Sequence, residues 1–107
     1  MHCTLWVCRE GPENADPLWA AYLAVRQALV ARMARAAGLK VGADGQESSR
    51  DLYVCGPPGQ IADFMRTLRD NGLCDFTIDA PSEALAELEE VNRKLARPPF
   101  EVVEVDG

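Results

Sequence analysis

Short apolar segments alternate with longer amphipathic ones along this chain, and this alternation limits its possible folds more than any other feature. Strand-like segments occupy residues 2–8, 51–55, 73–79 and 100–105. Segments with apolar residues at three- and four-residue steps, as in amphipathic helices, occupy residues 17–37, 60–71 and 81–97. The pattern predicts the order β-α-β-α-β-α-β.

This order is typical of α/β proteins. We expect residues 1–107 to form a single three-layer, Rossmann-like domain around a mainly parallel, four-stranded sheet with right-handed crossovers. The strand at 2–8 is apolar on both alternating faces and should be central and covered on both sides, whereas glutamates make 100–105 an edge strand. The small, polar residues 40–50 should form a mobile loop. The alternative is a two-layer α+β sandwich with all helices on one face.

Size and charge narrow the classes of function. A chain of 107 residues can bury a core without metal or disulfide support. Its net charge of -6 repels a phosphate backbone, so we expect no nucleic-acid partner and favour a protein with a basic surface. The sequence has neither a signal-like start nor an apolar stretch of membrane-spanning length. We therefore expect a cytoplasmic protein without a membrane partner.

The stretch DLYVCGPPGQ, residues 51–60, takes a strand directly into a turn of glycines and prolines. Free N–H groups at a helix N-terminus attract anions. Pro57 and Pro58 have no N–H, so an anion would meet the amides of Gly59 and Gln60. The alternative is a purely structural turn, with glycine for backbone freedom and proline for helix entry.

Residues 51–73, DLYVCGPPGQIADFMRTLRDNGL, resemble the late strand-turn-helix of the NAD(P)-binding lobe in the ferredoxin–NADP reductase family. That lobe reads much like Tyr-Val-Cys-Gly-Pro-Pro followed by an amphipathic helix. The resemblance implies that Cys55 and Gly56 lie beside a nicotinamide ring. It makes NAD(P) the candidate cofactor of a site formed by Cys55, Gly56, Pro57, Pro58, Gly59 and Gln60. The family's phosphate loop and flavin-binding barrel have no counterpart here, so we do not expect stand-alone reductase activity.

The chain contains four cysteines, which should stay reduced without a secretory signal. On a parallel sheet, Cys8 and Cys55 would share the carboxyl edge. Cys3 and Cys74 would then lie at the opposite edge, on the order of 15 Å away, so we predict no metal site. Cys55, ahead of a helix N-terminus, is the first candidate for a redox thiol, and Cys8 is the second. The alternative is that Cys3, Cys55 and Cys74 are core residues.

The helix predicted at 17–37 has a wide apolar surface. At about 1.5 Å per residue it is roughly 30 Å long, longer than a five- or six-residue strand. Its stripe consists of Leu18, Tyr22, Val25, Leu29 and Met33, flanked by Trp19, Leu23 and Val30. We expect the helix to overhang the sheet and to contact another molecule through Trp19 and Tyr22.

Three functions remain open. The first is a non-enzymatic accessory domain that acts through protein contacts or self-association, most simply as a homodimer. The second is a reduced domain that binds NAD(P) or another adenine nucleotide at the CGPPG turn. The third is a thiol redox protein that uses Cys55. We favour the first, and hence a protein that is not an enzyme, because it requires no part that the chain lacks.

Overall fold

The structure, a computed structural model, describes residues 1–7, 17–44, 51–73, 76–95 and 100–105. Its elements are β1 (Cys3–Val7), α1 (Pro17–Ala36), β2 (Lys40–Asp44), β3 (Asp51–Gly56), α2 (Pro58–Asp70), β4 (Phe76–Ala80), α3 (Ser82–Lys94) and β5 (Phe100–Glu104). Every predicted strand and helix is present. The described residues contain one further strand, β2, which lies where the sequence predicts a loop.

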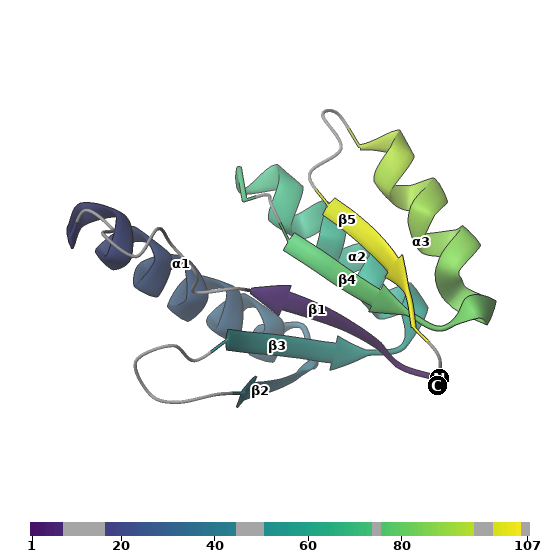
Figure 1. Cartoon of the computed structure of the whole chain (residues 1–107), viewed down its shortest axis with the longest axis horizontal. Helices are drawn as coiled ribbons and strands as arrows, with labels where there is room; N and C mark the ends of the chain where they lie inside the picture. Colours follow the sequence, from purple (N-terminus) through teal and green to yellow (C-terminus); the bar gives the residue numbers. More distant parts are fainter. Residues whose placement is uncertain (8–16, 45–50, 74–75, 96–99, 106–107) are drawn as a thin grey trace.

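The strands form one five-stranded sheet in the order β2-β3-β1-β4-β5 (Figure 1). β1 runs antiparallel to both β3 and β4, and β2 runs antiparallel to β3, while β4 and β5 form a parallel pair. The predicted mainly parallel, four-stranded sheet is therefore wrong. The physical reason is β2: the chain reverses between β2 and β3, so β3 returns between β2 and β1 and runs antiparallel to both.

The sequence of β2, Lys-Val-Gly-Ala-Asp, contains no apolar run and is hard to recognise as a strand. Its register places Val41 opposite Val54 and Gly42 opposite Tyr53. Val41 packs against the core, whereas a Cβ added at Gly42 would overlap the Tyr53 ring. The glycine that indicates a loop in the sequence thus makes room for an aromatic side chain on the neighbouring strand.

All three helices lie on one face of the sheet, so the domain has two layers (Figure 1). β1 shows the asymmetry: Cys3, Leu5 and Val7 are fully buried, while Thr4 and Trp6 are half-buried. The prediction that this strand is covered on both faces is wrong, and so is the three-layer arrangement that follows from it. The fold is the alternative considered above, a two-layer α+β sandwich.

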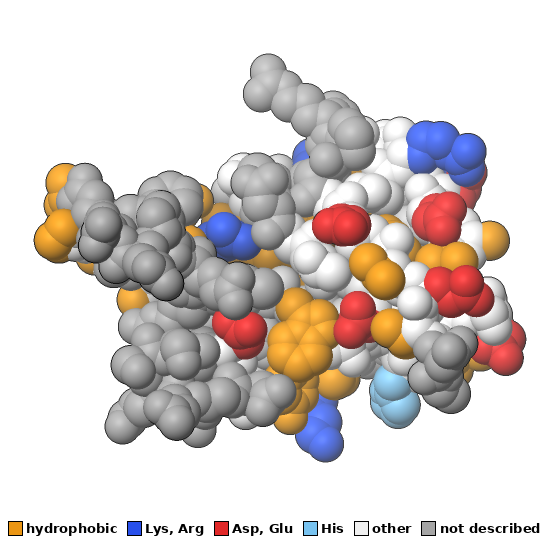
Figure 2. All heavy atoms as spheres, in the orientation of Figure 1, with side chains coloured by type: hydrophobic (Ala, Val, Ile, Leu, Met, Phe, Trp, Pro, Cys, Tyr) orange, Lys and Arg blue, Asp and Glu red, His pale blue; other side chains and the backbone are white. Residues whose placement is uncertain are grey.

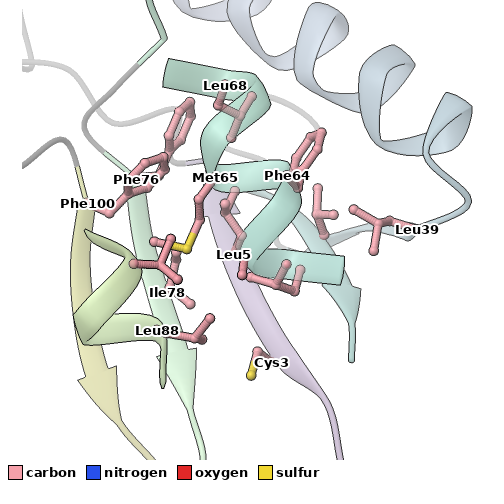
Figure 3. Packing of buried hydrophobic residues seen from close by; sticks show 14 of the residues in the cluster. Cys3, Leu5, Leu39, Phe64, Met65, Leu68, Phe76, Ile78, Leu88 and Phe100 are labelled. Atoms are coloured by element: carbon pink, nitrogen blue, oxygen red, sulfur yellow. The ribbon is translucent and has the colours of Figure 1, made fainter. Parts of the chain in front are cut away.

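The core lies between the sheet and the helices (Figure 3). Leu5 and Ile78, which are register partners on β1 and β4, project toward Met65 of α2 and Leu88 of α3. These four side chains are completely buried. They belong to one cluster that includes residues of every helix, so a single core holds the two layers together.

The predicted ends of the first two helices are confirmed. Gly38 follows α1 with φ 79°, and Gly72 follows α2 with φ 73°, a left-handed conformation that glycine adopts without strain. In each case the residue after the glycine donates its N–H to a carbonyl of the last helical turn, at 2.9 Å. Both helices therefore end in the hydrogen-bonding pattern of a glycine C-cap.

The last strand, β5, lies at an edge of the sheet, as its glutamates predict. Glu101, Val103 and Glu104 are exposed, while Phe100 is buried. Beyond β5, the N–H of Val105 donates to the Ala80 carbonyl at 2.9 Å. The start of β1 and the end of β5 lie at the same end of the sheet (Figure 1).

Candidate functional site

Helix α1 carries two apolar stripes rather than one. Leu23, Val30 and Ala34 are buried, with at most 5% of their surface exposed. A second set lies roughly a third of a turn away, since each residue advances a helix by about 100°. We call this second set the outward stripe; its members are Leu18, Tyr22, Val25 and Leu29, which are 77%, 49%, 66% and 42% exposed.

The outward stripe is continuous over three helical turns. Successive members are four, three and four positions apart, the spacing of a coiled-coil seam, and the stripe is about 16 Å long. Hydrophobic side chains are visible along the far left edge of the molecule in Figure 2, where the first turns of α1 extend past β1 and β3 in Figure 1. Of the two predicted contact residues, Tyr22 belongs to the stripe, and the side chain of Trp19 lies outside the described part of the chain.

The predicted cofactor-binding turn joins β3 to α2. Gly56 is the last residue of β3, Pro57 is the N-cap and Pro58 begins α2. Proline suits these positions because a helix leaves its first N–H groups without an internal partner. Gly59 and Gln60 are exposed in the first turn of the helix.

Packing explains the glycine of this turn. Gly56 is buried opposite Cys3, and a Cβ added there would overlap Cδ2 of Leu39. Leu39 is itself a core residue with 6% of its surface exposed. The absence of a side chain at Gly56 therefore lets Leu39 enter the core, without any need for a ligand.

The strand directions remove one of the two features that favoured nucleotide binding at the CGPPG turn. Ligands gather where the carboxyl ends of parallel strands meet, but β3 is antiparallel to its neighbours β1 and β2. Gly59 and Gln60 are exposed residues in the first turn of α2, but the start of any helix offers N–H groups to an anion. NAD(P) binding by residues 55–60, and the resemblance to the reductase lobe, stay predictions.

The two cysteines within the described residues differ in environment and face. Cys3 is completely buried, and burial raises the pKa of its thiol. Glu87 raises this pKa further, while the N-terminal ammonium group acts in the opposite direction. Cys55 is half-buried on the other face of the sheet, with Sγ 3.5 Å from Oγ1 of Thr4. Cys3 is therefore a core residue, and Cys55 is the more accessible thiol.

The premise behind the predicted placing of Cys8 with Cys55, that β1 and β3 run parallel, is wrong. In the antiparallel register Cys55 lies opposite Thr4, near the start of β1, whereas Cys8 follows the end of that strand. Cys8 and Cys74 themselves lie outside the described residues. Among the described residues, Cys55 is the candidate redox thiol, and the role of Cys8 stays a prediction.

We expect iodoacetamide to alkylate Cys55 at least about a hundredfold faster than Cys3 in the native protein. Only a thiolate reacts, and Cys3 combines full burial with a raised pKa. Peptide mass spectrometry after timed quenching measures both rates, and labelling in urea provides the reference for equal access. Equal native rates at the two cysteines would contradict the burial of Cys3.

The described residues were compared with the requirements of a metal site and of a membrane-spanning helix. Across these residues, no three histidine, cysteine or acidic side chains lie together as a metal site would need. The same part of the chain has no helix with the length and apolar character to cross a bilayer.

No protein family and no curated protein matches the sequence. Among solved structures, the chain is similar to MupZ from Pseudomonas fluorescens, with a TM-score of 0.60 and 12% identity, over 99% of this chain and 91% of that one. At such low identity the similarity establishes the fold alone. It supports the mixed five-stranded sheet with three helices against the predicted parallel one.

Proposed function

We propose that this protein is a non-enzymatic cytoplasmic interaction domain that self-associates through the outward stripe of α1. The observation that carries the proposal is the exposure of four large apolar or aromatic side chains in one line along a helix. Single exposed apolar residues are common on protein surfaces, but a contiguous stripe is typical of a contact surface.

The spacing of the stripe favours a second copy of the chain as the partner. Read in reverse, the intervals of four, three and four positions are unchanged. Two α1 helices that pair antiparallel about a twofold axis would therefore place Leu18 against Leu29 and Tyr22 against Val25. A twofold interface uses the same patch on both subunits, so it requires this kind of self-complementarity.

The surroundings of the stripe are also compatible with a close helix pair. Ala21 and Ala28 are exposed beside it, and small residues allow two helix backbones to approach each other. Arg32 and Arg35 follow the stripe toward the C-terminal end of α1. In an antiparallel pair the arginines of the two copies would lie at opposite ends, so like charges would not meet at the centre.

Substitution of Val25 by aspartate should weaken self-association by roughly tenfold or more. The symmetric contact would bury two carboxylates without partners, and an unpaired buried charge is costly. Sedimentation equilibrium over a wide range of protein concentration measures the dissociation constant. A matched control is Val103→Asp, which introduces the same change at an exposed valine on the sheet.

The two variants distinguish the possible outcomes. A wild-type protein that stays monomeric at submillimolar concentration would rule out the proposal. Association lost in Val103→Asp but retained in Val25→Asp would place the interface on the sheet instead of α1. Circular dichroism of both variants checks that each has kept its fold.

A further inference from the structure

The face of the sheet opposite the helices forms a second surface of distinct chemistry. The strand registers place on it Lys40, Gly42, Thr4, Trp6, Asp51, Tyr53, Cys55, Thr77, Asp79, Glu101 and Val103. No helix among the described elements covers it (Figure 1). Figure 2 shows hydrophobic side chains at its centre with acidic side chains on both sides. We call it the open face.

Two aromatic rings form the centre of the open face. Trp6 of β1 and Tyr53 of β3 are register partners, with ring centroids 5.5 Å apart and ring planes at 57°. The indole N–H of Trp6 donates a hydrogen bond of 2.9 Å to Oδ2 of Asp79 on β4. The ring of Tyr53 extends over Gly42, where a Cβ would overlap it. Contacts from both sides therefore hold the two rings in fixed orientations.

The charge around these rings is mainly negative. Asp51, Asp79 and Glu101 belong to the open face, and Lys40 is the basic residue that the registers place on it. The whole chain has a net charge of -6. Because phosphate groups would be repelled here, the rings are unsuited to stacking the bases of a nucleic acid. A cation would be attracted both by the carboxylates and by the aromatic ring faces.

Asp79 can serve a bound cation as well as Trp6. A carboxylate has about four lone-pair positions, and the indole N–H of Trp6 uses one of them. Asp79 is half-buried, so water and salt screen its charge less than they would screen a fully exposed carboxylate. The residue therefore combines a positioned carboxylate with an adjacent aromatic ring, the two groups that recognise a guanidinium ion.

We propose that the open face binds an arginine side chain in a basic segment of a protein partner. The guanidinium stacks on the Trp6–Tyr53 pair and donates hydrogen bonds to the Asp79 carboxylate. Arginine fits better than lysine because its planar group can stack and hydrogen-bond at once, whereas an ammonium ion is a compact point charge. This proposal does not depend on self-association, since the open face and the outward stripe lie on different elements.

Titration of the Trp19→Phe variant with a hexa-arginine peptide tests the proposal, because Trp6 is then the only tryptophan. We expect a saturable change in Trp6 fluorescence, and binding at least about threefold weaker for hexa-lysine. Isothermal calorimetry on the wild-type chain should give the same order of affinity.

Asp79→Asn should weaken hexa-arginine binding by about tenfold, since a hydrogen bond to a charged group is lost. The asparagine oxygen can still accept the indole N–H, so the rings should stay in place. The matched control is Asp63→Asn, which removes the same charge from an exposed position on α2 and should leave binding within about twofold.

Three outcomes would overturn the proposal. No binding of hexa-arginine at millimolar concentration would remove the site. An equal loss in Asp79→Asn and Asp63→Asn would mean that net charge alone attracts the peptide. Saturable binding of adenosine that Asp79→Asn leaves unchanged, without arginine binding, would identify the rings as a base-stacking surface instead.

Discussion

Replacement of Phe76 by alanine is expected to lower the free energy of unfolding by about 4 kcal/mol. Phe76 is 2% exposed, its ring centroid lies 5.7 Å from that of Phe100, and the Arg26 guanidinium lies 4.5 Å above the ring. Alanine removes the apolar surface of the ring, leaves a cavity, and deprives both neighbours of their contact. The thermal midpoint should fall by roughly 15–30 °C, measured by circular dichroism.

Two further variants serve as references for the stability lost in Phe76→Ala. Phe76→Leu retains most of the apolar volume and loses only the ring contacts, so its cost should be about 1 kcal/mol. Val25→Ala, on the outward stripe, should change stability by less than about 0.5 kcal/mol in dilute, monomeric protein. Urea denaturation measures all three. If Phe76→Ala costs no more than Val25→Ala, Phe76 does not belong to the core.

Local patterns predict this fold well wherever an element has one apolar and one polar side. The alternation in residues 73–79 predicts Phe76 and Ile78 inward and Thr77 and Asp79 outward, and β4 has this arrangement. The order of the strands and helices other than β2 follows from the same periods. These periods depend on neighbours within a few positions, which is why they can be read from one sequence.

The direction and coverage of the strands could not be predicted from those periods. Trp6 gives β1 an apolar residue on its second face, which is the pattern of a strand covered on both sides. In the structure Trp6 is half-buried on the open face, beside Tyr53 at a centroid distance of 5.5 Å. A strand that carries one half of an aromatic pair on its open face is apolar on both faces. A strand covered by helices on both sides has the same pattern, so the sequence does not distinguish the two. Gly42 similarly makes β2 hard to recognise as a strand in the sequence. The pairing of β2 with β3 makes the sheet mainly antiparallel.

The sequence predicts part of the candidate site on α1. The sequence identifies α1 as an apolar helix with an excess of hydrophobic surface, and it includes Tyr22 among the contact residues. It does not show that Val30 is completely buried while Val25 is 66% exposed, although both are valines on the same helix. That division depends on where the sheet meets the helix, which is a tertiary property.

Valine at Gly56 is expected to destabilise the protein by about 2–3 kcal/mol. The cause is steric, because a Cβ there would overlap Cδ2 of Leu39, which is only 6% exposed and has little space to move. Gly59 provides a matched control in the same turn, since a Cβ there has no atom within 4 Å. Gly59→Val should change stability by less than about 0.5 kcal/mol.

The double variant Gly56→Val with Leu39→Ala tests the steric explanation directly. Leu39→Ala alone should cost about 2–3 kcal/mol through the cavity it leaves. In the double variant the valine fills part of that cavity, so the combined cost should be at least about 1 kcal/mol smaller than the sum of the single costs. Urea denaturation of the four proteins completes the cycle. Additive costs would mean that Gly56 and Leu39 do not compete for space, and the glycine of the CGPPG turn would then need another explanation, such as the close approach of a ligand.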